Sequence, residues 1–161
     1  MTAFPALSVA NFVLEEAEAQ GKTLTIMQLL KLVYIAHGWS LALLDAPLVN
    51  EEPEAWQHGP VFPSVYREFR KFGAHPITGY RSNLRFANFA AGLSPEQQSV
   101  VQSVVRNYGN MHAFALSRIT HEAETPWSLT FKDGIGSSAD ISNAMIAAHY
   151  KKLARERRFA S

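Results

Sequence analysis

The hydrophobic pattern is strongest between Thr25 and Leu44, where apolar residues leave no continuous polar face on a helix. A helix that is apolar nearly all round is normally buried from several directions. Thr25 is followed three residues later by Gln28, a capping-box pattern that marks a helix start. At 1.5 Å per residue this helix would be roughly 30 Å long. Because Lys31 and His37 would be costly in hydrocarbon, we predict a central core helix rather than a membrane span.

Apolar residues at helical spacing predict further helices on both sides of the central one. Ser8 is a plausible N-cap for a first helix that ends at Gly21. Pro63 suits the first turn of a helix with an aromatic face, which Gly73 would end. Ser94 begins a second capping box with proline at the first helical position. Three more helical segments are expected: from about His112 to His121, around Pro126–Trp127, and after Asp140 as the cap of the last helix.

Short extended segments are expected at Ala55–Trp56 and between Pro76 and Ala87. Apolar and polar residues alternate between Pro76 and Ala87, which predicts one or two strands that could pair with Ala55–Trp56. Asp45–Pro53 and Asp133–Asp140 are expected to be exposed loops. The fold class is therefore mainly α (α+β): a compact helical domain around a central buried helix, with a small antiparallel β-sheet. We expect residues 1–161 to form a single domain whose basic end, 151–161, frays.

The most unusual run is Glu54–Pro63, with the sequence EAWQHGPVFP. Gly59 tolerates backbone angles closed to other residues, and Pro60 disfavours helical geometry at Gly59. The run therefore predicts a tight turn between an extended piece and a helix. Trp56 beside this turn suits either packing or the recognition of a partner, because aromatic residues are enriched at interaction hot spots.

Composition and charge narrow the protein class. The chain has 161 residues, of which 47% are hydrophobic and 18% charged, which fits one globular core. It contains no cysteine, which removes disulfides and thiolate metal sites. Without a signal-peptide pattern at residues 1–10, we expect a cytoplasmic protein with no membrane partner.

The sequence gives little support to an enzyme. It contains no HExxH, GxSxG, phosphate-binding glycine loop or nucleotide fingerprint, so we expect no catalytic residue, metal or cofactor. A cryptic hydrolase would have to use His37, His58 and His121 with Glu122 or Glu124. For each histidine a structural role is the better interpretation, and His37 is expected to be a hydrogen-bonded core residue.

A nucleic-acid-binding regulator is the other alternative. Five basic residues and Glu156 lie between Lys151 and Arg158, so the positive charge is concentrated at the C-terminal helix. The net charge of the whole chain is only +1, and no helix-turn-helix or RNP-like pattern is present. We therefore favour a solvated basic end over a nucleic-acid interface.

Three ordered motifs make the chain resemble a known family. They are Leu29–Trp39 (LLKLVYIAHGW), Ala55–Val61 (AWQHGPV) followed by Tyr66, and Thr120-His121 with Pro126-Trp127. Together they resemble the Panacea antitoxin domain, the SocA-like or phage-associated GepA-like family, from about Ser8 to Tyr150. The chain departs from the family pattern at Leu30, where Gln is frequent, and at Gln57-His58, where Lys-Tyr is frequent.

The resemblance implies a mainly helical antitoxin from a bacterial or phage toxin-antitoxin pair. Its partner would be a cognate protein toxin, neutralised by direct contact, with delivery of the toxin to the ClpXP protease as a further role. The toxin's identity, the choice between sequestration and delivery, and the oligomeric state stay open.

Candidate residues divide into a contact group and a structural group. Arg67, Arg70 and Lys71 would steer an acidic patch of the partner. The contact group comprises Trp56, His58, Pro60, Phe62, Tyr66, Arg67, Arg70 and Lys71. The structural group, expected to be held by the fold, comprises Lys31, Leu32, Tyr34, Trp39, Gly59, His121 and Trp127.

Overall fold

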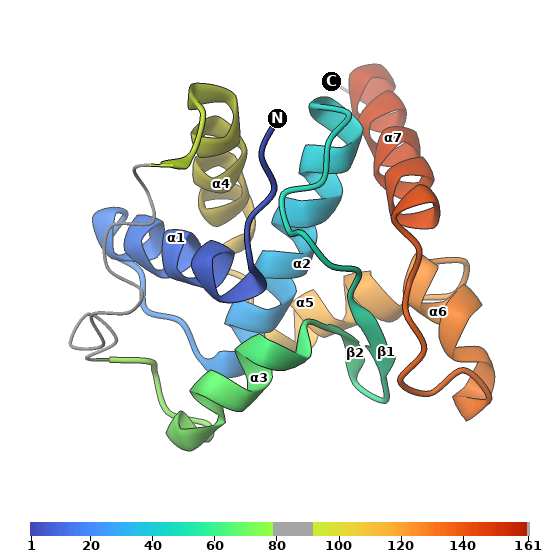
Figure 1. Ribbon diagram of the computed structural model, residues 1–161, viewed down its shortest axis with the longest axis horizontal. Coiled ribbons are helices and arrows are strands. Elements are labelled where there is room, and N and C mark those ends of the chain that lie inside the picture. The colour runs from blue at the N-terminus through green and yellow to red at the C-terminus, as the bar shows by residue number, and fades with distance from the viewer. Residues whose placement is uncertain (79–91, 161) are drawn as a thin grey trace.

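A computed structural model describes residues 1–78 and 92–160, which contain seven α-helices and one two-stranded antiparallel sheet (Figure 1). This confirms the mainly α fold class with a small β component. The elements, in chain order, are α1 (Ala6–Ala19), α2 (Ile26–Leu43), β1 (Glu54–Trp56), β2 (Gly59–Val61), α3 (Pro63–Phe69), α4 (Pro95–Tyr108), α5 (Ala113–His121), α6 (Pro126–Phe131) and α7 (Asn143–Ala160).

Helix α2 lies at the centre of the molecule, with α1 and α4 on one side and α7 on the other (Figure 1). It also contacts α3, α5 and β2, and most of its residues are buried. The predicted capping box between Thr25 and Gln28 is present. By length and composition α2 is the one helix among the described residues that could cross a membrane. It is 78% buried inside the protein, which is typical of a core helix.

The first helix begins three residues before the position that the sequence suggested, with Pro5 in place of Ser8 as the N-cap. Pro5, with an extended ψ of 147°, precedes α1, and the amide of Ser8 donates to the Pro5 carbonyl at 3.0 Å. Ser8 is therefore inside the helix and only 3% exposed, so its prediction as the N-cap was wrong. The chain enters the helix early because Phe4 forms a bridge with Val49 and proline is favoured at helix starts.

The small sheet is a hairpin between β1 and β2, with Trp56 opposite Gly59. The expected pairing of Ala55–Trp56 with a strand from Pro76–Ala87 falls mostly outside the described residues; within them, β1 pairs with β2. Residues 76–78 are not in a strand, and residues 79–87 lie outside the described part of the chain.

The other edge of β1 is paired with a segment far along the sequence. Ser138 donates to the Ala55 carbonyl at 2.7 Å, and Ala55 donates to the Ala139 carbonyl at 2.9 Å. Asp140 forms a bridge with Glu54. The end of the predicted Asp133–Asp140 loop is therefore fixed against the hairpin.

The start of α7 also differs from the prediction. The Ser142 hydroxyl accepts from the Met145 amide at 3.2 Å, so Ser142 takes the capping role expected of Asp140. The backbone is helical through Ala160, where a frayed basic end was expected. Side chains are described as far as Arg157.

The predicted Asp45–Pro53 loop is partly buried rather than exposed. Leu48 and Val49 are 0% exposed, and Pro53 is buried. The Glu52 carboxylate accepts from the Asn143 amide at 2.6 Å. This segment therefore packs into the core after α2 and is hydrogen-bonded through Glu52 to the start of α7.

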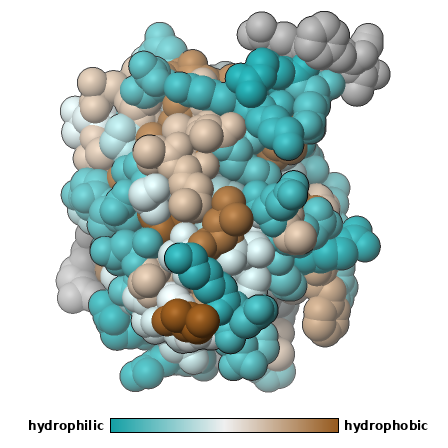
Figure 2. All heavy atoms as spheres, turned by 90° about the vertical axis from the view of Figure 1, so that its right-hand side faces the viewer, coloured by the Kyte–Doolittle hydropathy of each residue, from teal (hydrophilic) through white to brown (hydrophobic). Residues whose placement is uncertain are grey.

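The face of the molecule at α6 and α7 is mainly hydrophilic, and its apolar residues are separated from one another (Figure 2). Among the large exposed apolar side chains are Leu129 at 49% and Ile135 at 89%. Scattered apolar side chains of this kind are normal on a protein surface.

Candidate partner-binding site

The β1–β2 hairpin and the following helix α3 carry the predicted contact residues. Trp56 and Tyr66 are half-buried and His58 is exposed. The two rings of Trp56 and Tyr66 meet edge to face with their centroids 5.3 Å apart. The exposed cations Arg67, Arg70 and Lys71 follow on and just after α3.

Two predicted contact residues are not on the surface. Phe62 is 0% exposed and packs edge to face on His37, with 5.5 Å between ring centroids. Pro60 is buried in β2. Their assignment to the contact group is corrected, because an apolar residue at the hairpin–helix junction faces the core.

The buried side chain of Lys31 contacts strand β2 of the hairpin. Its side chain is 0% exposed, and its Nζ donates to the Pro60 carbonyl at 3.2 Å. A Cβ added to Gly59 would lie 2.7 Å from this Nζ and 3.7 Å from the hydroxyl oxygen of Thr120. The three motifs noted in the sequence therefore converge at one point: α2 gives Lys31, the hairpin gives Gly59 and α5 gives Thr120.

Burial of the Lys31 amine has an electrostatic cost. Because the charged form is disfavoured away from water, the pKa of Lys31 falls from 10.5 to about 8. The single carbonyl contact compensates only part of the lost hydration. The Lys31 amine therefore lies buried at the base of the hairpin, bonded to the Pro60 carbonyl.

The pKa of Lys31 predicts an unusual pH dependence of stability. Since the folded-state pKa is the lower one, the unfolded chain binds more protons between about pH 8 and 10.5, and stability rises with pH in that window. We expect the free energy of unfolding of the wild type, relative to Lys31→Met, to increase by about 2 kcal/mol from pH 7 to pH 9.5. Urea denaturation of both proteins at each pH measures it. An unchanged difference between the proteins would mean that the amine is not desolvated.

Trp127 joins α6 to the hairpin. Its indole Nε1 donates to the Trp56 carbonyl at 2.6 Å, and its ring lies 5.3 Å from that of His121. The Trp56 indole in turn donates to the Glu54 carboxylate at 3.0 Å. His121 Nδ1 is buried and has no hydrogen-bond partner among the described residues. Trp127 thus bonds the hairpin directly, and His121 packs behind it on the Trp127 ring.

Both ring nitrogens of His37 are hydrogen-bonded inside the core. Its Nδ1 accepts from the Val49 amide at 3.2 Å, so its Nε2 carries the proton and donates to the Asn143 side-chain oxygen at 2.8 Å. Burial lowers the pKa of His37, which favours this neutral tautomer. The residue is the hydrogen-bonded core histidine that the sequence predicted.

His58 and His121, the two further histidines that a cryptic hydrolase would have to use, do not meet His37. His58 is exposed at the hairpin turn, and His121 packs on Trp127. Within residues 1–78 and 92–160, no group of three or more His, Asp or Glu side chains is placed to hold a metal ion.

Several structural contacts were not foreseen from the sequence. Leu32, Tyr34 and Trp39 are buried on α2, and the rings of Tyr34 and Trp39 both pack on Tyr150 of α7. The Tyr150 ring lies 5.1 Å from that of Trp39 and directly against Gly38. Nothing in the local sequence of α7 identifies Tyr150 as the residue that packs against Gly38.

The chain is similar to known proteins over much of its length. The family model of the antitoxin SocA-like Panacea domain matches residues 29–128, which span from α2 into α6. Antitoxin SocA from Caulobacter vibrioides (strain NA1000 / CB15N) is 33% identical over 129 residues, covering 77% of this chain and 69% of that protein. No solved structure gives a significant match.

Proposed function

Because the chain belongs to the SocA-like Panacea antitoxin family, we propose that it neutralises a cognate protein toxin of a bacterial or phage toxin-antitoxin pair by binding it directly. In this proposal the chain acts in the cytoplasm as one domain, without catalytic chemistry of its own. The observation that supports it best is a set of half-buried aromatic and exposed cationic side chains, carried by the hairpin and the helix that follows it.

The contact surface that we propose consists of Trp56, His58, Tyr66, Arg67, Arg70 and Lys71. The hairpin beneath it is held by Lys31 on one side and by Trp127 on the other. A surface that is fixed before binding loses little conformational entropy when the partner docks. Half-buried aromatic rings can therefore serve as anchors without rearrangement of the backbone.

The three cations give the proposed contact surface a positive charge. Arg67, Arg70 and Lys71 are exposed. Cations of this kind attract an acidic patch and raise the association rate more than they raise affinity. We therefore propose that the toxin presents an acidic surface to α3.

Co-expression of the chain with each neighbouring open reading frame tests the function. Rescue of growth together with co-elution of both proteins is the expected result. Rescue without co-elution would instead indicate accelerated degradation, and repeating the rescue in a ClpX-deficient host tests delivery to ClpXP. If no neighbour is toxic and nothing co-elutes, the proposal is wrong.

Reversing two charges on the proposed surface should separate binding from folding. We expect Arg70→Glu with Lys71→Glu to slow association with the toxin about tenfold and to weaken protection, because an acidic patch would then be repelled. The melting temperature should stay near that of the wild type, because both side chains are exposed. Stopped-flow association and growth assays measure the two effects.

A matched control reverses two exposed charges elsewhere. Arg106→Glu with Arg155→Glu changes the net charge equally, on α4 and α7. This control should associate at a rate close to that of the wild type. If both pairs slow association equally, general charge rather than the α3 surface steers the toxin.

A further inference from the structure

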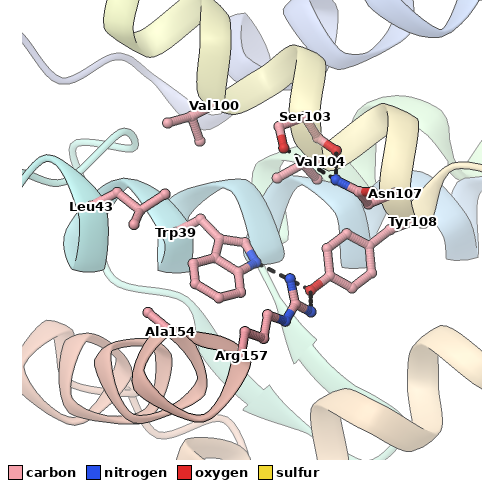
Figure 3. Close-up of a pocket in the computed structure, with 9 residues that line it drawn as sticks. All are labelled: Trp39, Leu43, Val100, Ser103, Val104, Asn107, Tyr108, Ala154 and Arg157. Atoms are coloured by element: carbon pink, nitrogen blue, oxygen red, sulfur yellow. Dashed lines mark hydrogen bonds between the residues drawn. The ribbon is translucent and has the colours of Figure 1, made fainter. Parts of the chain in front are cut away.

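A groove of about 250 Å³ opens between α2, α4 and α7, away from the hairpin (Figure 3). Helix α4 forms one wall and α7 the other, and two side chains of α2 lie between them. Trp39 is eight residues after Lys31 on α2, which places the groove about 12 Å further along the helix axis. The lining residues are Trp39, Leu43, Val100, Ser103, Val104, Asn107, Tyr108, Ala154 and Arg157.

Three of the lining residues form a connected unit. The Trp39 indole donates to the Tyr108 hydroxyl at 3.2 Å, and the Arg157 guanidinium donates to the same oxygen at 2.6 Å. The guanidinium carbon lies 4.9 Å from the centre of the Trp39 ring. Trp, Tyr and Arg are the residue types that contribute most often to binding hot spots. Here they are already held in position, as the dashed lines in Figure 3 show.

The rest of the groove is apolar. Val100, Val104 and Ala154 supply aliphatic walls, and Leu43, which is 59% exposed, forms the lip. The Asn107 side-chain amide donates to the Ser103 carbonyl at 2.9 Å and to the Ser103 hydroxyl at 3.2 Å, so the two polar side chains of α4 bond each other within the helix. An apolar side chain entering the groove would therefore displace water from mainly aliphatic and aromatic surface.

The charge of the groove has one sign. Of the described residues that line it, Arg157 is the only charged one, and none carries a carboxylate. Lys151 lies one turn before Ala154 on α7, where its Nζ pairs with the Asp45 carboxylate at 3.4 Å, so the positive charge of the groove itself comes from Arg157. A ligand with negative charge beside its apolar part is complementary to this arrangement.

We propose that this groove binds a segment of a partner protein in which one large apolar side chain is flanked by carboxylates. The apolar side chain occupies the space between Trp39, Val100 and Val104. The neighbouring carboxylates face Arg157 on α7. This binding surface is separate from the hairpin surface proposed for the toxin, and its test does not depend on the identity of the toxin.

The three tryptophans provide site-specific reporters for the test. In a ¹⁵N-labelled protein, the indole signal of Trp39 reports on the groove, whereas those of Trp56 and Trp127 report on the hairpin. The probe is the peptide acetyl-Glu-Glu-Phe-Leu-Glu-Glu-amide. The matched peptide acetyl-Lys-Lys-Phe-Leu-Lys-Lys-amide has the same apolar pair and the opposite charge. The acidic peptide should shift the Trp39 signal saturably, and the basic peptide should bind at least about tenfold more weakly.

Two variants at one position separate charge from packing. Ser103→Glu adds a carboxylate at the edge of the groove, and Ser103→Gln adds a neutral side chain of the same shape. Because Ser103 is exposed on α4, both variants should fold. We expect roughly tenfold weaker binding of the acidic peptide to Ser103→Glu than to Ser103→Gln.

Four outcomes would overturn the proposal. They are the absence of a Trp39 shift up to the solubility limit of the acidic peptide, equal binding of the two peptides, shifts at Trp56 or Trp127 in place of Trp39, and equal affinities for the two Ser103 variants.

Discussion

Gly59→Ala is expected to lower the free energy of unfolding by about 3 kcal/mol, equivalent to a fall in melting temperature of roughly 10 °C. Gly59 has a φ of +125°, which residues with a side chain rarely adopt. Its added Cβ would also lie 2.7 Å from the buried Lys31 Nζ. The amine can move away only by giving up its hydrogen bond to Pro60. Thermal and urea denaturation measure the effect.

Gly73→Ala is the matched control for this prediction. Gly73 also has a positive φ, +57°, but no atom lies within 4 Å of an added Cβ. Its replacement should therefore cost about 2 kcal/mol, the backbone strain of a residue with a Cβ at φ 57° and ψ −129°, without the additional clash. Equal melting temperatures for Gly59→Ala and the wild type would contradict the packing of the hairpin on Lys31.

Gly38→Ala is expected to destabilise the protein by about 2 kcal/mol, although alanine is normally the better helix former by about 1 kcal/mol. An added Cβ at Gly38 would lie 2.3 Å from a carbon of the Tyr150 ring. Tyr150 is itself only 5% exposed and packs against Trp39 and Tyr34, so the ring cannot move away freely. Urea denaturation measures the loss of stability.

A double-mutant cycle with Tyr150→Leu tests the cause of that loss. If the contact between α2 and α7 causes it, Gly38→Ala should cost at least about 1 kcal/mol less when Tyr150 is already Leu. Additive effects of the two substitutions would mean that the clash with Tyr150 is not the cause.

The parts of the fold that depend on local chemistry could be predicted from the sequence. Thr25 and Ser94 each form the predicted capping box, since the hydroxyl and the Gln three residues later need only their own helix. The central position of α2 followed from its lack of a polar face. Lys31 was assigned to the structural group only because the sequence resembled a known family.

The parts that depend on distant residues could not be predicted. A Gly-Pro-Val run has little intrinsic tendency to form a strand, and β2 is supported by the contact of Pro60 with Lys31, 29 residues away. Likewise, Ala55 pairs with Ala139, which no local pattern indicates.

The candidate contact surface was predictable in part. The exposed cations on and just after α3 follow from helical spacing, because the apolar face of this segment must turn toward the core. The burial of Phe62 was missed, since the exact start of a helix decides which way its preceding residue faces. The groove at Trp39, Tyr108 and Arg157 combines three helices that are far apart in the sequence, so only the structure reveals it.

Titration of the purified toxin with the purified chain, in the absence of any protease, tests the central claim most directly. The account predicts loss of toxin activity at a defined stoichiometric ratio, with co-elution of the two proteins as one complex. Full toxin activity in the presence of excess chain would contradict neutralisation by direct binding.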